Sequence, residues 1–227
     1  MIYRRILACI LLSVIALPLA AQEKSVKPGI NKSFKNPDVK QFIERFEREG
    51  REIWDQKERT VKELRLEPGM VVADVGAGTG FMTFLFAKAV GDRGTVYAVD
   101  IARNFLKHIE EKAKQEGLSN IKTVLASATS SNLPAESVDV VFICDTYHHF
   151  EFPQKTMASI FRAVKPGGRL VLVDFERIPG KSSDWILNHV RAGKDVFRQE
   201  VESAGFEFVC EKDGIFKSNY FLVFKKP

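Results

Sequence analysis

A run of alternating glycines behind an apolar strand constrains the fold of this chain more than any other feature of its sequence. The run is Val71-Val-Ala-Asp-Val-Gly-Ala-Gly-Thr-Gly80. Its three glycines let the backbone approach a ligand closely. A helical pattern at 79–90 follows at once, so its free N–H groups point toward the loop. A strand, a glycine loop and a helix in this order predict the first unit of a nucleotide-binding α/β domain.

The rest of the chain continues this alternation of strands and helices. Apolar strands are predicted at 71–75, 95–100, 121–125, 138–144, 169–175, 206–211 and 220–224. Helices are predicted at 79–90, 102–117, 153–164 and 193–204. Most of these strands are apolar on both faces, as a parallel sheet covered by helices requires. We therefore predict a three-layer, Rossmann-like α/β fold with helices on both faces of the sheet.

The residues around the loop distinguish between two classes of cofactor. Asp100 ends the second strand, 20 residues after Gly80, where a carboxylate can accept hydrogen bonds from ribose hydroxyls. A dinucleotide site needs Gly-x-Gly-x-x-Gly, but the sixth position here is the bulky Phe81. Asp74, near the end of the first strand, suits the cationic end of S-adenosylmethionine (SAM). The pattern therefore favours SAM, and a dinucleotide-dependent oxidoreductase is the less favoured alternative.

From about residue 52 to its C-terminus, the chain resembles class I SAM-dependent methyltransferases, in particular the small-molecule group that includes the ubiquinone/menaquinone-biosynthesis type. The matching stretches follow the order and spacing of that family, and they are 71–80, Val96-Tyr-Ala-Val-Asp100, Asn132-Leu-Pro134 with Ser137-Val-Asp-Val-Val141, and Val164-Lys-Pro-Gly-Gly-Arg-Leu170. The resemblance implies a seven-stranded, mostly parallel sheet whose last strand is antiparallel. It also implies an enzyme that transfers a methyl group from SAM to an acceptor.

The resemblance further implies which residues bind SAM. The methionine part would lie on Asp74 and the glycine loop, and the ribose on Asp100. Ile101 would pack on the adenine, with Ser127 and Ala128 at the adenine edge. The family often has an acid where Ser127 stands, so a hydroxyl would replace a carboxylate there. The full set, which adds Asp145 in the methyl-transfer pocket, is Asp74, Gly76, Ala77, Gly78, Thr79, Gly80, Asp100, Ile101, Ser127, Ala128 and Asp145.

Two adjacent histidines are the candidate catalytic residues. The stretch Cys144-Asp-Thr-Tyr-His-His-Phe150 leaves the fourth strand at the edge where such sheets bind ligands. We predict that His148 or His149 acts as a general base or anchors the acceptor. The alternative is that one histidine is exposed and the other only packs. Methyl transfer needs a base only if the acceptor must lose a proton.

The same histidines raise the question of a metal site. His148, His149 and Asp145 offer ligand atoms, but adjacent histidines on one loop are weak evidence for a metal. His189 and Asp184 follow the fifth strand, and they could approach the same edge or lie in a solvated loop. We therefore predict no metal site.

The N-terminus is typical of a secretory signal. Arg4 and Arg5 precede an apolar run at 6–17, and small residues precede Gln22. The predicted organisation is a signal peptide at 1–21, a polar linker at 22–38, and a methyltransferase domain at 39–227 with a helical cap at 39–66. The apolar run is shorter than the ~20 residues that a spanning helix needs, and an uncleaved membrane anchor is the alternative.

Both interpretations of the N-terminus place the domain outside the cytoplasm, in the periplasm or the extracellular space. SAM is made in the cytoplasm, so export leaves a second hypothesis, which is a non-catalytic SAM-fold binding module. The net charge of +5 falls to +3 without Arg4 and Arg5 (32 basic minus 29 acidic residues), which is too small to indicate nucleic-acid binding. The aromatic residues Tyr147 and Phe150 favour an apolar or aromatic acceptor, and we predict that the acceptor is small or lipid-like. The sequence indicates no oligomeric state.

Overall fold

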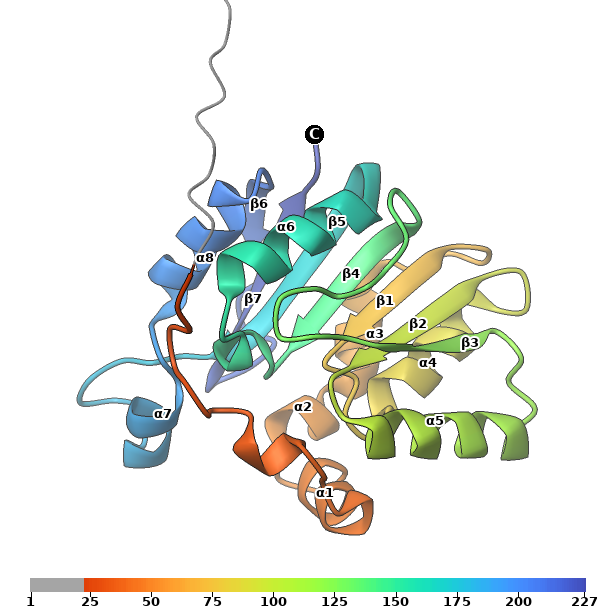
Figure 1. The fold of residues 1–227 in the computed structure, drawn as a ribbon, viewed down its shortest axis with the longest axis horizontal. Coiled ribbons are helices and arrows are strands. Elements are labelled where there is room, and N and C mark those ends of the chain that lie inside the picture. Colours follow the sequence, from red (N-terminus) through yellow and green to blue (C-terminus); the bar gives the residue numbers. More distant parts are fainter. Residues whose placement is uncertain (1–22) are drawn as a thin grey trace, which may run out of the picture.

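The structure, a computed structural model, describes residues 23–227 and contains a seven-stranded sheet in the order β3-β2-β1-β4-β5-β7-β6 (Figure 1). The strands are β1 (Val71–Val75), β2 (Thr95–Asp100), β3 (Ile121–Leu125), β4 (Val138–Cys144), β5 (Val164–Phe175), β6 (Glu207–Glu211) and β7 (Asn219–Lys225). Strand β7 is antiparallel to both of its neighbours, and the other pairs are parallel. The prediction of a mostly parallel, Rossmann-like sheet with an antiparallel last strand is confirmed.

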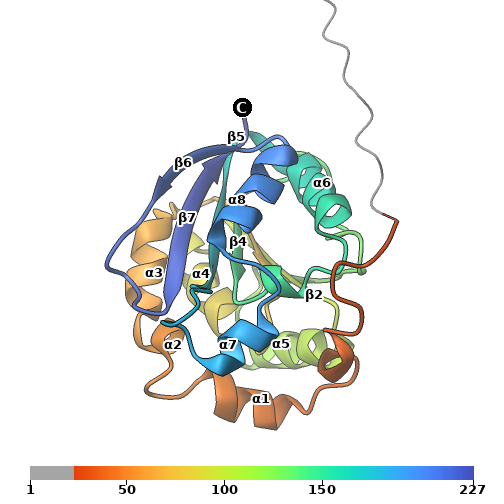
Figure 2. The same ribbon diagram turned by 90° about the vertical axis from the view of Figure 1, so that its left-hand side faces the viewer.

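Helices cover both faces of the sheet (Figure 2). They are α1 (Val39–Phe46), α2 (Glu52–Asp55), α3 (Lys57–Leu64), α4 (Phe81–Val90), α5 (Arg103–Gln115), α6 (Pro153–Ala163), α7 (Asp184–His189) and α8 (Lys194–Ser203). Alternate residues of β4 serve two cores: Val141 and Ile143 share one with α6 and α8, whereas Phe142 packs on Phe86 of α4, with 5.2 Å between ring centroids. This alternation explains why the strands are apolar on both faces.

Three differences from the predicted elements are larger than two residues. The helical pattern of the cap is divided into α1, α2 and α3, with a break at Gly50, whose φ is +82°. Strand β5 begins at Val164 and not at 169, because Val164 already pairs with Val138 across the Pro-Gly-Gly turn. Helix α7 was not among the predicted helices, and its N-terminus is capped by the Ser183 hydroxyl, which accepts from the Ile186 N–H.

The stretch predicted as a linker packs on the domain from Val26 onward. The Val26 N–H donates to the carbonyl of Glu151 at 2.9 Å, and the Asn31 side chain donates to the carbonyl of His149 at 3.0 Å. The short 3-10 helix η1 (Lys32–Phe34) follows, and the centroid of its Phe34 ring lies 5.3 Å from that of the Phe42 ring. The polar composition gave no sign of these contacts, since one is made by a backbone N–H, one by a side-chain amide and one by a single aromatic ring.

The described residues can also be compared with the dimensions of a membrane. Within residues 23–227, no helix is both long and apolar enough to span a bilayer. The predicted signal peptide at 1–21 lies outside the described residues.

Candidate active site

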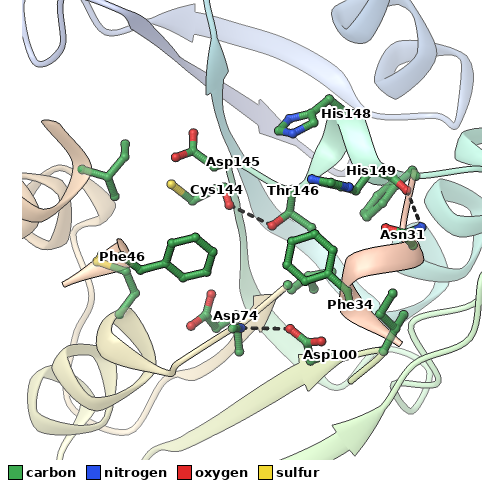
Figure 3. A pocket seen from close by; sticks show the side chains of 18 of the residues that line it. Asn31, Phe34, Phe46, Asp74, Asp100, Cys144, Asp145, Thr146, His148 and His149 are labelled. Carbon is green, nitrogen blue, oxygen red and sulfur yellow. Dashed lines mark hydrogen bonds between the residues drawn. The ribbon is translucent and has the colours of Figure 1, made fainter. Parts of the chain in front are cut away.

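A cavity of about 490 Å³ is lined by residues at the carboxyl ends of β1, β2 and β4 and by residues of α1 and α7. Figure 3 shows its two ends, with the rings of Phe34 and Phe46 and the side chain of Thr146 between them. We call one the glycine-loop end, which consists of Asp74, Gly76, Gly78 and Asp100. We call the other the histidine end, which consists of His148, His149 and His189. The edge of the sheet predicted to bind ligands therefore does contain a cavity.

The three glycines of the loop all have positive φ, but they meet different neighbours. A Cβ on Gly76 would lie 2.3 Å from Thr146 Oγ1, and a Cβ on Gly80 would lie 2.6 Å from Ile109 Cγ1. A Cβ on Gly78 would meet only the Phe46 ring, at an ordinary 3.5 Å. Gly76 and Gly80 are therefore required by packing, whereas Gly78 leaves the loop open toward the cavity.

This difference predicts unequal costs for two alanine substitutions. Gly76→Ala should destabilise the protein by about 2–5 kcal/mol, because it adds a clash between the new Cβ and the Thr146 side chain to the strain of a left-handed alanine. Gly78→Ala should cost only about 1–2 kcal/mol, from the strain alone. Urea unfolding of the two variants beside the wild type measures both values. Equal costs would contradict the contact between Gly76 and Thr146.

The glycine-loop end contains two buried carboxyl groups. Asp74 accepts a hydrogen bond from Thr83 Oγ1 at 2.6 Å, and burial raises its pKa to about 7. Asp100 accepts from the N–H groups of Gly78 at 2.9 Å and Ala102 at 2.8 Å, and burial raises its pKa as well. Within residues 23–227, no basic side chain forms an ion pair with either carboxyl.

Two buried acids without a cationic partner fit a ligand that brings positive charge and hydroxyl donors. SAM has both, in its ammonium and sulfonium groups and in its ribose. The loop above Gly78 is open to such a ligand, and the cavity volume lies in the usual range of small-molecule sites. The residues of this end therefore fit the cofactor that the sequence favoured.

Most of the predicted cofactor residues line the cavity, and two do not. The lining set is Asp74, Gly76, Ala77, Gly78, Asp100, Ile101, Ser127, Ala128 and Asp145. Thr79 is fully buried beneath the loop, where its hydroxyl has no hydrogen-bond partner among the described residues, and Gly80 packs on Ile109. These two residues shape the loop from behind.

Asp145 is already engaged by neighbouring side chains. Arg51 donates to its Oδ2 at 2.9 Å, and Asn219 donates to its Oδ1 at 2.7 Å. Burial raises the pKa of Asp145, and the Arg51 charge opposes that rise. Arg51 also lies over the Phe46 ring, 4.8 Å from its centroid. Asp145 thus joins the β4 loop to the helical cap beside the cavity.

The histidine end contains a buried pair and an imidazole–imidazole contact. His148 is 1% exposed, and its Nδ1 lies 2.7 Å from Oδ1 of Asp174. The Nε2 atoms of His149 and His189 lie 3.3 Å apart. Burial lowers the pKa of His149 to about 2 and that of His189 to about 4, with the neighbouring His148 as a further cause in both. His149 and His189 are therefore neutral imidazoles at pH 7.

The structure brings together residues that the sequence left apart. We predicted that His189 and Asp184 either approach this edge of the sheet or lie in a solvated loop. His189 does contact His149, whereas Asp184 is not among the residues that line the cavity. Asp174, whose carboxylate contacts His148, was not among the predicted site residues. Its position at the end of β5, beside β4, was the available signal, because parallel neighbours end at the same edge. Phe34 and Arg51 also line the cavity, and no pattern in the sequence indicated them.

Comparisons with known proteins agree with this geometry. A family model described as a methyltransferase domain matches residues 66–213. A ubiquinone/menaquinone biosynthesis C-methyltransferase from Marinomonas sp. is 32% identical over 126 residues, which cover 55% of this chain and 49% of that protein. A demethylmenaquinone methyltransferase from Geobacillus sp. is 29% identical over 154 residues, which cover 68% of this chain and 64% of that protein. The chain spans about half the length of the first curated relatives it matches.

Solved structures with the same fold include cofactor-dependent methyltransferases. A SAM-dependent methyltransferase from Aquifex aeolicus has a TM-score of 0.73 at 26% identity, and the match covers 84% of this chain and 99% of that one. Phosphoethanolamine N-methyltransferase 2 of Haemonchus contortus, solved with SAM, has a TM-score of 0.65 at 18% identity, covering 77% of this chain and 53% of that one. The dinucleotide alternative gains no support from these comparisons.

Proposed function

Because this chain belongs to the methyltransferase-domain family, we propose that it binds SAM at the glycine-loop end and transfers the methyl group to an acceptor at the histidine end. One observation supports this assignment above the others. One cavity joins two buried acids, neither of which has a basic partner among residues 23–227, to a cluster of imidazoles. Donor and acceptor can then meet within one enclosed volume, as an in-line displacement requires.

The residues of the glycine-loop end have separate tasks in holding SAM. Asp74 faces the ammonium group, and Asp100 accepts from the ribose hydroxyls while it fixes the loop through Gly78. Ile101 packs on the adenine, with Ser127 at its edge. When bound, SAM supplies a methyl group already activated on a sulfonium. The protein therefore has to align the two partners and exclude water.

We propose that the acceptor is an aromatic ring such as a quinol. Beside the histidine end, the lining of the cavity includes apolar and mostly aromatic side chains, which are those of Phe34, Phe150, Phe175, Trp185 and Ile186. The curated relatives are named for methylation of quinones. A quinol also explains the need for imidazoles, since a ring carbon or hydroxyl becomes a strong nucleophile only when it loses a proton. The histidine end activates the acceptor in this way.

Titration of the full chain with SAM and with its demethylated product tests the first half of the proposal. We expect saturable binding of both, and no binding at millimolar ligand would favour the non-catalytic module. Transfer of a labelled methyl group from SAM to a reduced naphthoquinone tests the second half. Labelled product would support the quinol class, whereas SAM binding without transfer to it would overturn that class and leave the cofactor assignment intact.

We propose that residues 1–21 direct export and are removed. The support is the arrangement of Arg4 and Arg5, an apolar run and small residues. Expression in a bacterial host should give a periplasmic protein whose intact mass lacks residues 1–20 or 1–21. An uncleaved mass in the membrane fraction would instead identify the segment as an anchor. Cytoplasmic protein of full mass would contradict both.

A further inference from the structure

The chain has four histidines, and three of them meet at one point of the cavity. His148 and His149 belong to the 3-10 helix η2 (Tyr147–His149) after β4. His189 ends α7, 40 residues further along the chain. Each offers one ring nitrogen, and the three nitrogens lie within 4.8 Å of one another. From the sequence we predicted no metal site, because adjacent histidines on one loop are weak evidence for one, and the fold adds His189 to that pair.

The spacing of these nitrogens suits a metal ion. The two Nε2 atoms of His149 and His189 are 3.3 Å apart. A tetrahedral zinc ion with Zn–N bonds of 2.0–2.1 Å holds its ligand nitrogens about 3.3 Å apart. The distances from the third nitrogen to these two are at most 4.8 Å, so each has to shorten by no more than about 1.5 Å to reach the same spacing. Three imidazoles with an open fourth position are a ligand set of catalytic zinc sites.

The surroundings orient the imidazoles as metal ligands are commonly oriented. Oδ1 of Asp174 lies 2.7 Å from Nδ1 of His148, which leaves Nε2 of that ring as the atom that can bind a metal. A carboxylate on the far nitrogen of a ligating histidine fixes its tautomer and raises its basicity. Trp185 stacks on His189, with 4.7 Å between ring centroids and 18° between planes. Phe34 contacts His149 edge-on at 5.0 Å.

We propose that His148, His149 and His189 bind one divalent transition-metal ion, with a fourth position open toward the acceptor. A hydroxyl oxygen of the acceptor binds the ion at that position and releases its proton to water, which leaves an anionic oxygen on the metal. The ion thereby makes the acceptor a stronger nucleophile. The role of the ion in activating the acceptor rests on the proposed function, whereas the binding of the ion does not.

The fourth histidine provides a matched control for a binding test. His108 lies on α5, outside this cluster. The full chain is stripped with a chelator and titrated with Zn²⁺ by calorimetry and with Co²⁺ by visible absorption. We expect one ion per chain and a tetrahedral Co²⁺ spectrum. His149→Gln and His189→Gln should each weaken Zn²⁺ binding at least tenfold, whereas His108→Gln should not change it.

Binding of SAM by each variant confirms that the variant is folded. The proposal is overturned if the wild type binds no stoichiometric ion, or if both cluster variants retain its affinity. Methyl transfer before and after chelation separates this proposal from the proposed function. Stoichiometric metal binding without any transfer would contradict the proposed function alone. Full transfer activity in metal-free protein would overturn the role of the ion in activating the acceptor.

Discussion

Replacing Asp74 with Asn should stabilise the ligand-free protein at alkaline pH and weaken its binding of SAM. The Asp74 carboxyl has a pKa of about 7 in the fold, against about 4 in an unfolded chain. Its contribution to stability is therefore fully present below about pH 4 and is lost as the pH rises through 7. Three pKa units correspond to about 4 kcal/mol, so ionisation of Asp74 lowers the free energy of unfolding by about that amount. No reduction for solvent screening applies, because the side chain is only 3% exposed.

An amide at this position has no such cost. Asp74→Asn should exceed the wild type in unfolding free energy by about 1.5 kcal/mol at pH 5 and by up to about 4 kcal/mol at pH 8. Urea unfolding at the two pH values, without SAM, measures this difference. The same variant should bind SAM about 10- to 100-fold more weakly, because a hydrogen bond to a charged group is lost. Calorimetric titration with SAM gives that ratio.

Asp139 is a suitable control for this substitution. It lies at the start of β4, where it accepts from the Val71 N–H and forms an ion pair with Lys165 at 2.8 Å. Asp139→Asn should keep the affinity for SAM, because Asp139 does not line the cavity. If Asp74→Asn behaved in the same way, the cationic end of the cofactor would not lie at Asp74.

Replacing His148 with Gln should lower kcat by about 10²- to 10⁴-fold and leave SAM binding unchanged. Loss of an acid–base group commonly has a cost of this size. The loss is expected whether the imidazole takes the proton itself or holds a metal ion that acidifies the acceptor. Methyl transfer to a reduced naphthoquinone and calorimetry with SAM measure the two quantities. A wild-type kcat in this variant would remove His148 from the chemistry.

We expect Asp174 to act on the acceptor only through His148, as a positioning residue, because its carboxylate contacts the His148 ring. Asp174→Asn should lower kcat by about 10- to 100-fold with SAM affinity retained. The double variant of His148→Gln and Asp174→Asn should lose no more than His148→Gln alone, because the two residues act as one unit. Independent, additive losses would indicate that Asp174 only supports the fold. His108→Gln, outside the cavity, is the control for both.

The sequence by itself determined the strands, the glycine loop and the acidic residues at its end. The strand bounds of β1 to β4 agree with the prediction, because each is an apolar run ended by local turn chemistry. Asp74 and Asp100 could be placed at one edge of the sheet from the sequence, because a parallel sheet brings the carboxyl ends of its strands to that edge. The features that could be predicted in this way are local in the sequence or follow from the topology of the sheet.

Only the tertiary structure determined how the histidine end of the cavity is assembled. Asn31 contacts the carbonyl of His149 across 118 residues of chain, and His189 contacts the ring of the same residue across 40. Neither segment has a periodic pattern that predicts its path, and α7 has only six residues. Such contacts depend on how separate segments pack over the finished sheet. The glycine loop therefore identifies the cofactor from sequence alone, whereas the histidine end exists only in the folded chain.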